Sequence, residues 1–286
     1  MNIEITKNTT QEQWNEVLQA MHEIQIELAN EFKRICDQHQ IAYFTIAGTT
    51  LGAIRHKGFI PWDDDMDFGM LRADYRRFLE IAKYELGWKY FLQNWYTDPN
   101  YGLPFTKLQY KFSSLIEDNQ DESLQEHSGI FIDIFPYDFI PKDHDVRYHI
   151  YNRYQYYSRL LKLKNGYTFK TDTFKKKVAI TLLKFVAGFQ SRQKLIDLME
   201  AIEMECNVQH EDSGLLITLG GWYGPDKELM YLDWCINLME HEFEDSSYLV
   251  QVNYKAYLTH LYNDYLTLPP EDQRYNQHGI KRVEIK

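Results

Sequence analysis

The sequence has little cysteine, no excess of basic charge and no long hydrophobic run. Its three cysteines, Cys36, Cys206 and Cys235, lie far apart and not at metal-binding spacing, so we expect them to pack inside a protein of a reducing compartment. The 31 Lys and Arg residues face 42 Asp and Glu residues, which gives a net charge of −11. We therefore expect no nucleic acid partner, because no overall basic field would displace its counterions.

Targeting segments and linkers are also missing from the sequence. The first five residues have neither the basic start nor the apolar core of a signal peptide, and no apolar run reaches the length that spans a bilayer. We find no repeats, low-complexity tracts or Gly/Ser linkers. A chain of 286 residues can bury a full core. We therefore expect a cytoplasmic globular enzyme.

Apolar spacing predicts one or two helices over about 10–38, with Thr10 as the N-cap, and further helices over about 74–84 and 254–265. Residues 42–140 alternate short strands and helices, and the chain becomes mainly helical from Asp143 onward. We predict an α+β fold. Its two parts are a catalytic core with an N-terminal helix over 1–140 and a mainly helical C-terminal lobe, packed on that core, over 141–286.

The most informative segment is acidic and begins at Trp62 with the sequence WDDDMDFGM. Side chains alternate between faces in a strand, so Asp63, Asp65 and Asp67 would share one face, while Asp64 falls on the apolar face as a structural residue. Three carboxylates on one face repel each other and are costly to bury, and a divalent cation removes that repulsion. The segment predicts a metal site. A calcium loop is disfavoured because Phe68 stands where that loop needs glycine.

A later acid strengthens the prediction. Residues 129–136 form a short apolar run between glycine and proline, typical of an internal strand, with Asp133 at its centre. If the two strands are neighbours, Asp65, Asp67 and Asp133 form a cup for one or two Mg²⁺ (or Mn²⁺) ions. We assign these three residues to catalysis and metal binding. A structural role for Asp133, with its carboxylate bound by backbone N–H groups, is the alternative.

Phosphate-binding residues are predicted before the acidic segment. Residues 42–47 read as a strand that leads into a helix, where glycine lets the backbone approach a ligand and the helix start attracts anions. Hydroxyl and basic side chains follow, and these neutralise or donate to a diphosphate. The residues assigned to this role are Gly48, Thr49, Thr50, Arg55 and Lys57.

Other candidates lie near the predicted acids. Lys107 follows a predicted strand start and is assigned to phosphate or the leaving group, and His127 is a candidate contact for phosphate or donor. Trp62, Trp95 and Tyr110 could stack on a base or hold a quaternary ammonium group by cation–π attraction. Core packing is the alternative for each of these aromatic residues.

Basic residues gather between Arg159 and Lys194 around the apolar run 178–189. The run is too short to span a bilayer but suits a membrane interface, where each basic side chain near anionic lipid contributes about 1 kcal/mol. The alternative is a core helix with solvated lysines. If the segment binds lipid, the protein lies peripherally at the inner face of the membrane.

Several of these motifs together resemble the LicD family of bacterial phosphocholine transferases and, more distantly, fukutin-type proteins. The resemblance runs from about residue 25 to the end and is carried by the segments 48–67, 104–108, 127–136, 222–224 and 261–271. It implies a nucleotidyltransferase-like mixed sheet with flanking helices. It also implies metal-dependent transfer of a phospho-alcohol, most often phosphocholine from CDP-choline, with CMP leaving. The acceptor would be a cell-surface glycan, such as teichoic acid or lipopolysaccharide, or its lipid-linked precursor.

Thr50, Val252, Lys255 and Asn263 depart from the family pattern, which leaves the donor head group and the acceptor open. Two other functions stay as alternatives. One is a nucleotidyltransferase that attacks the α-phosphorus of a nucleoside triphosphate and releases pyrophosphate. The other is a non-catalytic member of the family that binds glycan.

Overall fold

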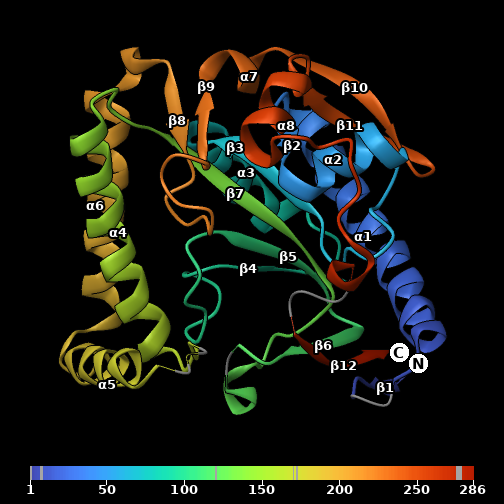
Figure 1. The fold of residues 1–286 in the computed structure, drawn as a ribbon, viewed down its shortest axis with the longest axis horizontal. Coiled ribbons are helices and arrows are strands. Elements are labelled where there is room, and N and C mark those ends of the chain that lie inside the picture. Colours follow the sequence, from blue (N-terminus) through green and yellow to red (C-terminus); the bar gives the residue numbers. More distant parts are fainter. Residues whose placement is uncertain (1, 7–8, 120, 170, 172, 275–278) are drawn as a thin grey trace.

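The computed structural model describes residues 2–6, 9–119, 121–169, 171, 173–274 and 279–286. Its centre is a mixed sheet with helices on both faces, which confirms the α+β prediction (Figure 1). The strands of its main path are, in spatial order, β2 (Phe44–Thr45), β3 (Asp67–Leu71), β7 (Phe131–Phe139), β5 (Thr106–Tyr110) and β4 (Tyr90–Gln93). Two further strands, β8 (Leu215–Ile217) and β9 (Leu229–Tyr231), extend the sheet beside the end of β7.

Strand β7 organises the sheet. It runs parallel to β3 along one edge, while β5 pairs antiparallel with its first half and β8 with its end along the other. Because side chains alternate in a strand, Ile132 and Ile134 enter the core on one face, and Phe131, Asp133 and Phe135 point to the other. The predicted strand over 129–136 is thereby confirmed.

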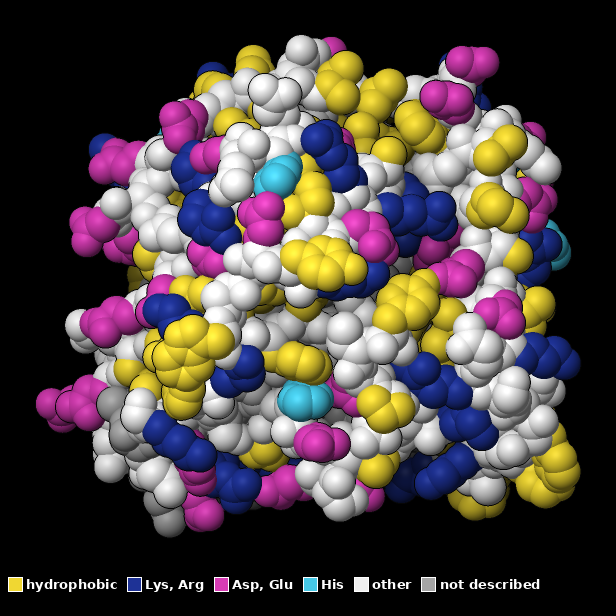
Figure 2. Space-filling model, turned by 180° about the vertical axis from the view of Figure 1, so that it is seen from behind, with side chains coloured by type: hydrophobic (Ala, Val, Ile, Leu, Met, Phe, Trp, Pro, Cys, Tyr) yellow, Lys and Arg dark blue, Asp and Glu magenta, His cyan; other side chains and the backbone are white. Residues whose placement is uncertain are grey.

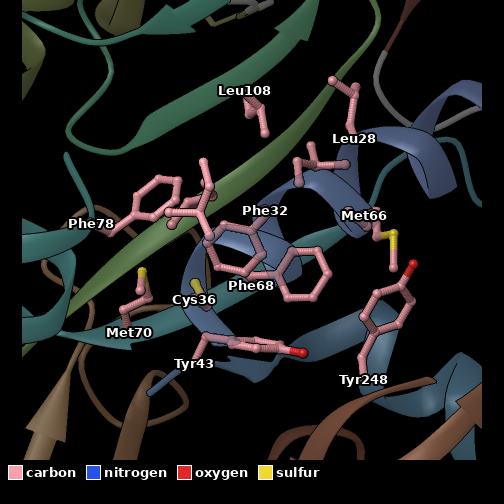
Figure 3. Close-up of a cluster of buried hydrophobic side chains, with 14 of the residues drawn as sticks. Leu28, Phe32, Cys36, Tyr43, Met66, Phe68, Met70, Phe78, Leu108 and Tyr248 are labelled. Atoms are coloured by element: carbon pink, nitrogen blue, oxygen red, sulfur yellow. The ribbon is translucent and has the colours of Figure 1, made fainter. Parts of the chain in front are cut away.

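One face of the sheet is covered by α1 (Gln11–His39) and α3 (Arg72–Glu85). The predicted N-cap is confirmed, since the Thr10 hydroxyl accepts from the Gln13 N–H and the Gln13 side chain accepts from the Thr10 N–H. Phe32 of α1 packs against Phe68 of β3 with ring centroids 4.9 Å apart (Figure 3). Each such buried side chain contributes about 1.5–3 kcal/mol, so this face anchors the fold.

The opposite face is covered by shorter elements. They are α2 (Ala47–His56), α7 (Leu232–Ile236) and α8 (Tyr254–Tyr262). The hairpin of β10 (Leu238–Phe243) and β11 (Ser246–Gln251) instead adds Phe243, Tyr248 and Val250 to the core on the α1 side. A separate small sheet joins β1 (Asn2–Glu4), β12 (Ile280–Ile285) and β6 (Ser113–Glu117), which brings the two ends of the chain side by side (Figure 1). Short 3-10 turns lie at Glu122–Leu124, Glu211–Ser213 and Glu271–Gln273.

Three helices, α4 (His144–Lys164), α5 (Phe174–Phe189) and α6 (Arg192–Gln209), stand to one side of the sheet (Figure 1). A buried ion-pair network ties them to it: Arg72 lies 2.6 Å from an Asp138 oxygen and 3.0 Å from a Glu203 oxygen. Residues 141–286 thus contain these helices and also the strands β8 to β12. The division of the chain at residue 140 stays a prediction.

Two expectations about local structure are wrong. The acidic segment is not a strand from Asp63, because β3 begins at Asp67 and residues 63–66 form a loop after the turn at Pro61 and Trp62. The helix α5 is not a core helix, since Ala187 is the buried side chain among its described residues. The alternation in the acidic segment does not by itself make a strand, because residues 63–66 have no paired strand among the described residues. The apolar side chains of α5 do not make a core helix, because most of them face solvent.

Candidate active site

A cavity of about 610 Å³ opens beside β7, on the face opposite the core that α1 and α3 cover. It is bounded by the sheet, by the end of α4, by the loop between β8 and β9, and by α8. Its charged lining residues are Asp64, Asp65, Asp67, Lys107, Glu117, Asp118, Asp133, Lys162, Lys227 and Glu228. The three predicted catalytic acids therefore line one cavity, together with three lysines.

Strand pairing brings two of these acids together. Asp67 begins β3, and its Cα partner on the parallel strand β7 is Asp133. Register partners on neighbouring strands point to the same face, so both carboxylates face the cavity. The backbone is fixed here, because the Asp133 N–H donates to the Met66 carbonyl (2.9 Å) and the Asp67 N–H donates to the Thr49 hydroxyl (2.8 Å).

The loop before β3 adds the other acids. One ligand oxygen from each of Asp63, Asp64 and Asp65 lies within 4.8 Å of the others, a spacing that is suitable for a cation. Side chains of α1 hold the loop from behind: a ring nitrogen of His22 lies 2.8 Å from the Asp63 carbonyl, and the Gln25 amide donates to the Asp64 carbonyl (2.9 Å). Closely spaced carboxylate oxygens are the donors that Mg²⁺ and Mn²⁺ prefer.

This spacing places Asp64, interpreted from the sequence as structural, among the candidate ligands. The residues present thus fit a divalent cation. The assignment of that cation to Asp65, Asp67 and Asp133 stays a prediction.

Lys107 connects the strands to the acids. It faces Asp133 across the β5–β7 pair, with its Nζ 3.6 Å from Asp133 Oδ1 and 3.8 Å from Glu117 Oε2. The same ammonium lies 3.0 Å from the centre of the Phe131 ring. Two carboxylates and a ring hold this buried lysine side chain at the cavity, where it can contact an anion.

The start of α2 differs from the predicted phosphate site. A Cβ on Gly48 would lie 2.6 Å from an oxygen of Asp63, so the close approach that glycine permits here is to a carboxylate of the protein. An anion is favourable at this helix start, and Asp63 supplies one. Ala47, just before Gly48, has a φ of 44°, and its N–H donates to the Tyr257 hydroxyl (2.8 Å).

The other predicted phosphate contacts lie outside the lining of this cavity. Thr50 is fully buried, with its hydroxyl 2.9 Å from that of Thr45. Arg55 donates to the carbonyl of Tyr265 (2.8 Å), and Lys57 pairs with Glu242 on the β10–β11 hairpin (3.2 Å). Thr49, in contrast, contacts the backbone of the acidic strand. The sequence does not reveal this difference, because it depends on the direction in which each side chain leaves the helix. Their contact with substrate stays a prediction.

His127 and the predicted aromatic residues lie near the cavity but not on it. The His127 ring stacks on Phe91 with centroids 3.9 Å apart, and His127 lines a small hollow that it shares with Lys107 and Glu117. Arg274 lies over the Trp62 ring (5.3 Å), and the carbonyl of Trp95 accepts from Arg192 (2.7 Å). The exposed aromatic residues at the cavity are instead Trp222 and Tyr223.

Six of the described charged residues in the cavity lining were not predicted as site residues: Asp64, Glu117, Asp118, Lys162, Lys227 and Glu228. Two of them, Lys162 and Glu228, are buried groups with shifted pKa values. Lys162 of α4 is buried beside the Trp222 ring (5.0 Å), and burial together with nearby Arg159 lowers its pKa to about 8. Burial raises the pKa of Glu228 to about 7, although the Tyr223 N–H donates to it (2.8 Å). The segment 222–224, which carries part of the family resemblance, indicated that this region is functional. Nothing in the sequence distinguished Lys162 from the other lysines of the basic segment.

The fold and this site define an α+β protein with acids and lysines around one cavity, and comparison with known proteins assigns it to the phosphotransferase enzymes. A model of the nucleotidyltransferase domain described as LicD/FKTN/FKRP matches residues 40–159. The lipopolysaccharide cholinephosphotransferase LicD of Haemophilus influenzae is 30% identical over 261 residues, which cover 88% of this chain and 92% of that protein. The chain belongs to the LicD family.

Shorter matches accompany this one. An uncharacterized protein of Rickettsia typhi is 38% identical over 55 residues, which cover 19% of this chain and 18% of that protein. Another from Rickettsia prowazekii is 40% identical over 48 residues, or 17% of this chain and 18% of that protein. These relatives carry no stated activity, so they add nothing on function.

Within the described ranges, each helix is too short or too polar to cross a membrane.

Proposed function

We propose that this enzyme transfers phosphocholine from CDP-choline to lipopolysaccharide or a related cell-surface glycan, with CMP as the leaving group. The relative that matches nearly the whole chain is named for transfer of phosphocholine and for lipopolysaccharide. The observation that carries the proposal is the register of Asp67 and Asp133 on two parallel strands, where they line one cavity with Lys107 and Lys162. Carboxylates and ammonium groups in one cavity suit a substrate that is itself anionic and bound with a cation.

A divalent cation, Mg²⁺ or Mn²⁺, is the cofactor in this proposal, with Asp65, Asp67 and Asp133 as its ligands. When bound, the cation would place positive charge on the donor diphosphate and favour ionisation of an acceptor hydroxyl. The family match and the close spacing of the acids before β3 support this choice.

The residues of the chain then have separate roles. Asp133 would orient the acceptor hydroxyl for in-line attack on the phosphorus distal to the nucleoside. The hydroxyl oxygen forms the new bond to phosphorus, the bond from phosphorus to the CMP oxygen breaks, and the hydroxyl proton leaves through the Asp133 carboxylate. Lys107 and Lys162 would offset the charge that builds on the departing CMP, because both ammonium groups are buried and little screened by water.

Product analysis tests the proposal. The full chain is incubated with Mg²⁺, CDP-choline and lipopolysaccharide, and we expect CMP and phosphocholine-modified glycan in equal amounts, with both lost when the metal is chelated. A nucleotidyltransferase would instead release pyrophosphate from a nucleoside triphosphate. Failure to bind CDP-choline in calorimetry, with or without Mg²⁺, would favour the non-catalytic alternative.

The donor head group needs its own test. CDP-choline, CDP-ribitol and CDP-glycerol are compared for thermal stabilisation of the protein in the presence of Mg²⁺. We expect the largest shift with CDP-choline, since at equal concentration the ligand with the lowest Kd stabilises the folded state most, and this stabilisation grows with the logarithm of the ratio of concentration to Kd. A larger shift with CDP-ribitol or CDP-glycerol would retain the reaction type but reassign the donor.

The location of the reaction is also part of the proposal. A lipid-linked glycan precursor would be met at the cytoplasmic face of the membrane, and the segment 159–194 is the region of the chain suited to peripheral contact there. Within this region, α5 is a helix whose apolar side chains are largely exposed.

A further inference from the structure

Helix α5 presents an apolar stripe to solvent. The stripe consists of Phe174, Val178, Leu182, Phe185 and Phe189, spaced at three or four residues so that they share one side of the helix. Its largest members are well exposed: Phe174 by 78%, Phe185 by 68% and Phe189 by 74%. Single exposed apolar residues are common on proteins, but a continuous stripe of this kind marks a contact surface.

The other side of α5 already has its partner. Ala187 is buried, and Ile180 and Leu183 pack against the cluster formed by α4 and α6. This side alone holds α5 against α4 and α6. The stripe is therefore not part of the core, and its exposure calls for an explanation outside the folded chain.

Charge around the stripe is of one sign. Lys175, Lys176, Lys177 and Lys184 are exposed, and α5 contains no acidic residue, although the whole chain has a net charge of −11. Basic and apolar side chains gather at the lower right of Figure 2, the place that α5 takes when Figure 1 is turned. Elsewhere on that face acidic and basic side chains are interspersed.

Not every basic side chain of the segment 159–194 can reach an outside partner. Lys162 is buried at the cavity, and Arg192 donates to the carbonyls of Trp95 (2.7 Å) and Asp98 (3.1 Å), so neither is available to an outside partner. Lys170 lies outside the described residues. Arg159, Lys164 and Lys194 are exposed on the neighbouring helices, and Lys175, Lys176, Lys177 and Lys184 are exposed on α5 itself.

These observations select one partner, an anionic lipid surface. Phenylalanine and leucine on one face with lysines beside them are typical of a helix that lies in the plane of a membrane interface. Lysines near anionic headgroups add an attraction that an apolar protein partner would not supply. A second copy of this chain fits less well, because one face of a 16-residue helix, about 24 Å long, is too small for the roughly 800 Å² per partner of a stable interface.

We propose that the exposed face of α5 docks the protein on an anionic membrane, with the stripe in the headgroup region and the flanking lysines on the lipid phosphates. Residues 167–169 line the cavity, and α5 begins close to them in the sequence, at Phe174. Docking through α5 therefore holds the cavity close to the lipid surface. This last consequence rests on the proposed function, whereas the docking itself does not.

Vesicle flotation tests the docking without any enzymatic readout. The full chain is mixed with vesicles of phosphatidylcholine alone or of phosphatidylcholine with phosphatidylglycerol. We expect binding to the anionic vesicles, weakened by salt because screening reduces the attraction of exposed charges. The double variant Leu182→Ser, Phe185→Ser should bind at least about tenfold less, since it removes two large apolar side chains from the interface. The triple variant Lys175→Gln, Lys176→Gln, Lys177→Gln should lose the preference for anionic lipid.

Matched controls separate docking from general stickiness. Tyr84→Ser removes an equally exposed aromatic residue from α3, and Lys111→Gln removes an exposed lysine far from α5 in the sequence; both should bind like the unmodified protein. Equal binding of all variants would overturn the proposal. So would a dimer in sedimentation velocity that Phe185→Ser converts to a monomer without any vesicle binding. If the protein binds anionic vesicles but transfers no phosphocholine, the proposed function is wrong and the docking proposal still holds.

Discussion

Two aspartates on β7 face opposite sides of the sheet and meet opposite surroundings. Asp138 is fully buried and accepts from Arg72 Nε (2.7 Å), Arg72 NH2 (2.6 Å) and the Asn207 amide (2.6 Å). Asp133 lies beside Asp67 at the cavity, with Lys107 at 3.6 Å. One carboxylate is held by a bidentate guanidinium and the other shares a cavity with further carboxylates. The comparison teaches that a buried acid indicates function only when its neighbours repel it or leave room for a ligand.

The largest expected effect concerns the cavity side of β7. Asp133→Asn keeps the size of the side chain but removes its charge, so we expect the rate of CMP release to fall by about a thousandfold or more, because positioning and metal binding supply most of phosphoryl-transfer catalysis. Stability should change little, since the variant loses both the repulsion between Asp133 and Asp67 and the attraction between Asp133 and Lys107. The measurement pairs CMP release with urea unfolding.

Asp145→Asn is the control for this variant, because the Asp145 side chain is almost fully exposed. It should leave both the rate and the stability as they are. If Asp133→Asn turned over normally but unfolded easily, the roles of Asp133 and Asp138 would be reversed.

The next largest effect concerns the other side of the strand. Arg72→Met leaves the carboxylates of Asp138 and Glu203 buried without their shared cation, and breaking such a buried pair typically costs about 3–5 kcal/mol. We expect urea unfolding to reveal a loss of this size, while the rate per folded molecule stays near normal. Arg34→Met is the matched control: its partner Glu31 lies 2.8 Å away at the surface, where a pair contributes about 1 kcal/mol or less. Equal losses for the two variants would contradict a structural role for the network.

The sequence predicted the position of Asp133 at the cavity better than that of Asp138 in the ion-pair network. Asp67 and Asp133 were found because acids within or beside an apolar run are costly to bury. That their strands are neighbours was only a condition of the prediction, and the structure supplies it. Asp138 lies in the same strand, but its partner Arg72 is the first residue of a helix, and nothing local announces that it turns inward. The helix over 10–38 was predictable because its capping and spacing are local.

The misjudged residues share one physical cause, which is that their environment is made by distant segments. Asp63, Asp65 and Asp67 are spaced as alternate residues of a strand, yet the first two lie in a loop. A turn before this loop, together with His22 and Gln25 of α1, sets its conformation. Thr49 and Thr50 are identical in the sequence, but one holds the backbone of Asp67 and the other is buried against Thr45. Lys162 becomes a cavity residue only because the segment around Trp222 folds over it.

Glu228 combines features of both aspartates and gives the smallest of these effects. It is buried as Asp138 is and faces the cavity as Asp133 does, but within the described residues no cation pairs with it. Burial raises its pKa from 4.5 to about 7. Because the folded state binds this proton more tightly, the penalty is absent below pH 4.5 and grows to at most about 3 kcal/mol as the pH rises through 7.

Glu228→Gln keeps an oxygen for the Tyr223 N–H but cannot ionise. We therefore expect the free energy of unfolding in urea to be equal for the variant and the unmodified protein near pH 4.5, and higher for the variant above pH 7. Glu126→Gln, at an exposed glutamate, should follow the unmodified protein at both ends. A stability difference that does not change with pH would mean that Glu228 is already neutralised by a neighbour, and it would then belong with Asp138 as a structural acid. A difference that opens with pH and closes when CDP-choline and Mg²⁺ are added would place it with Asp133, among the groups whose charge awaits a ligand.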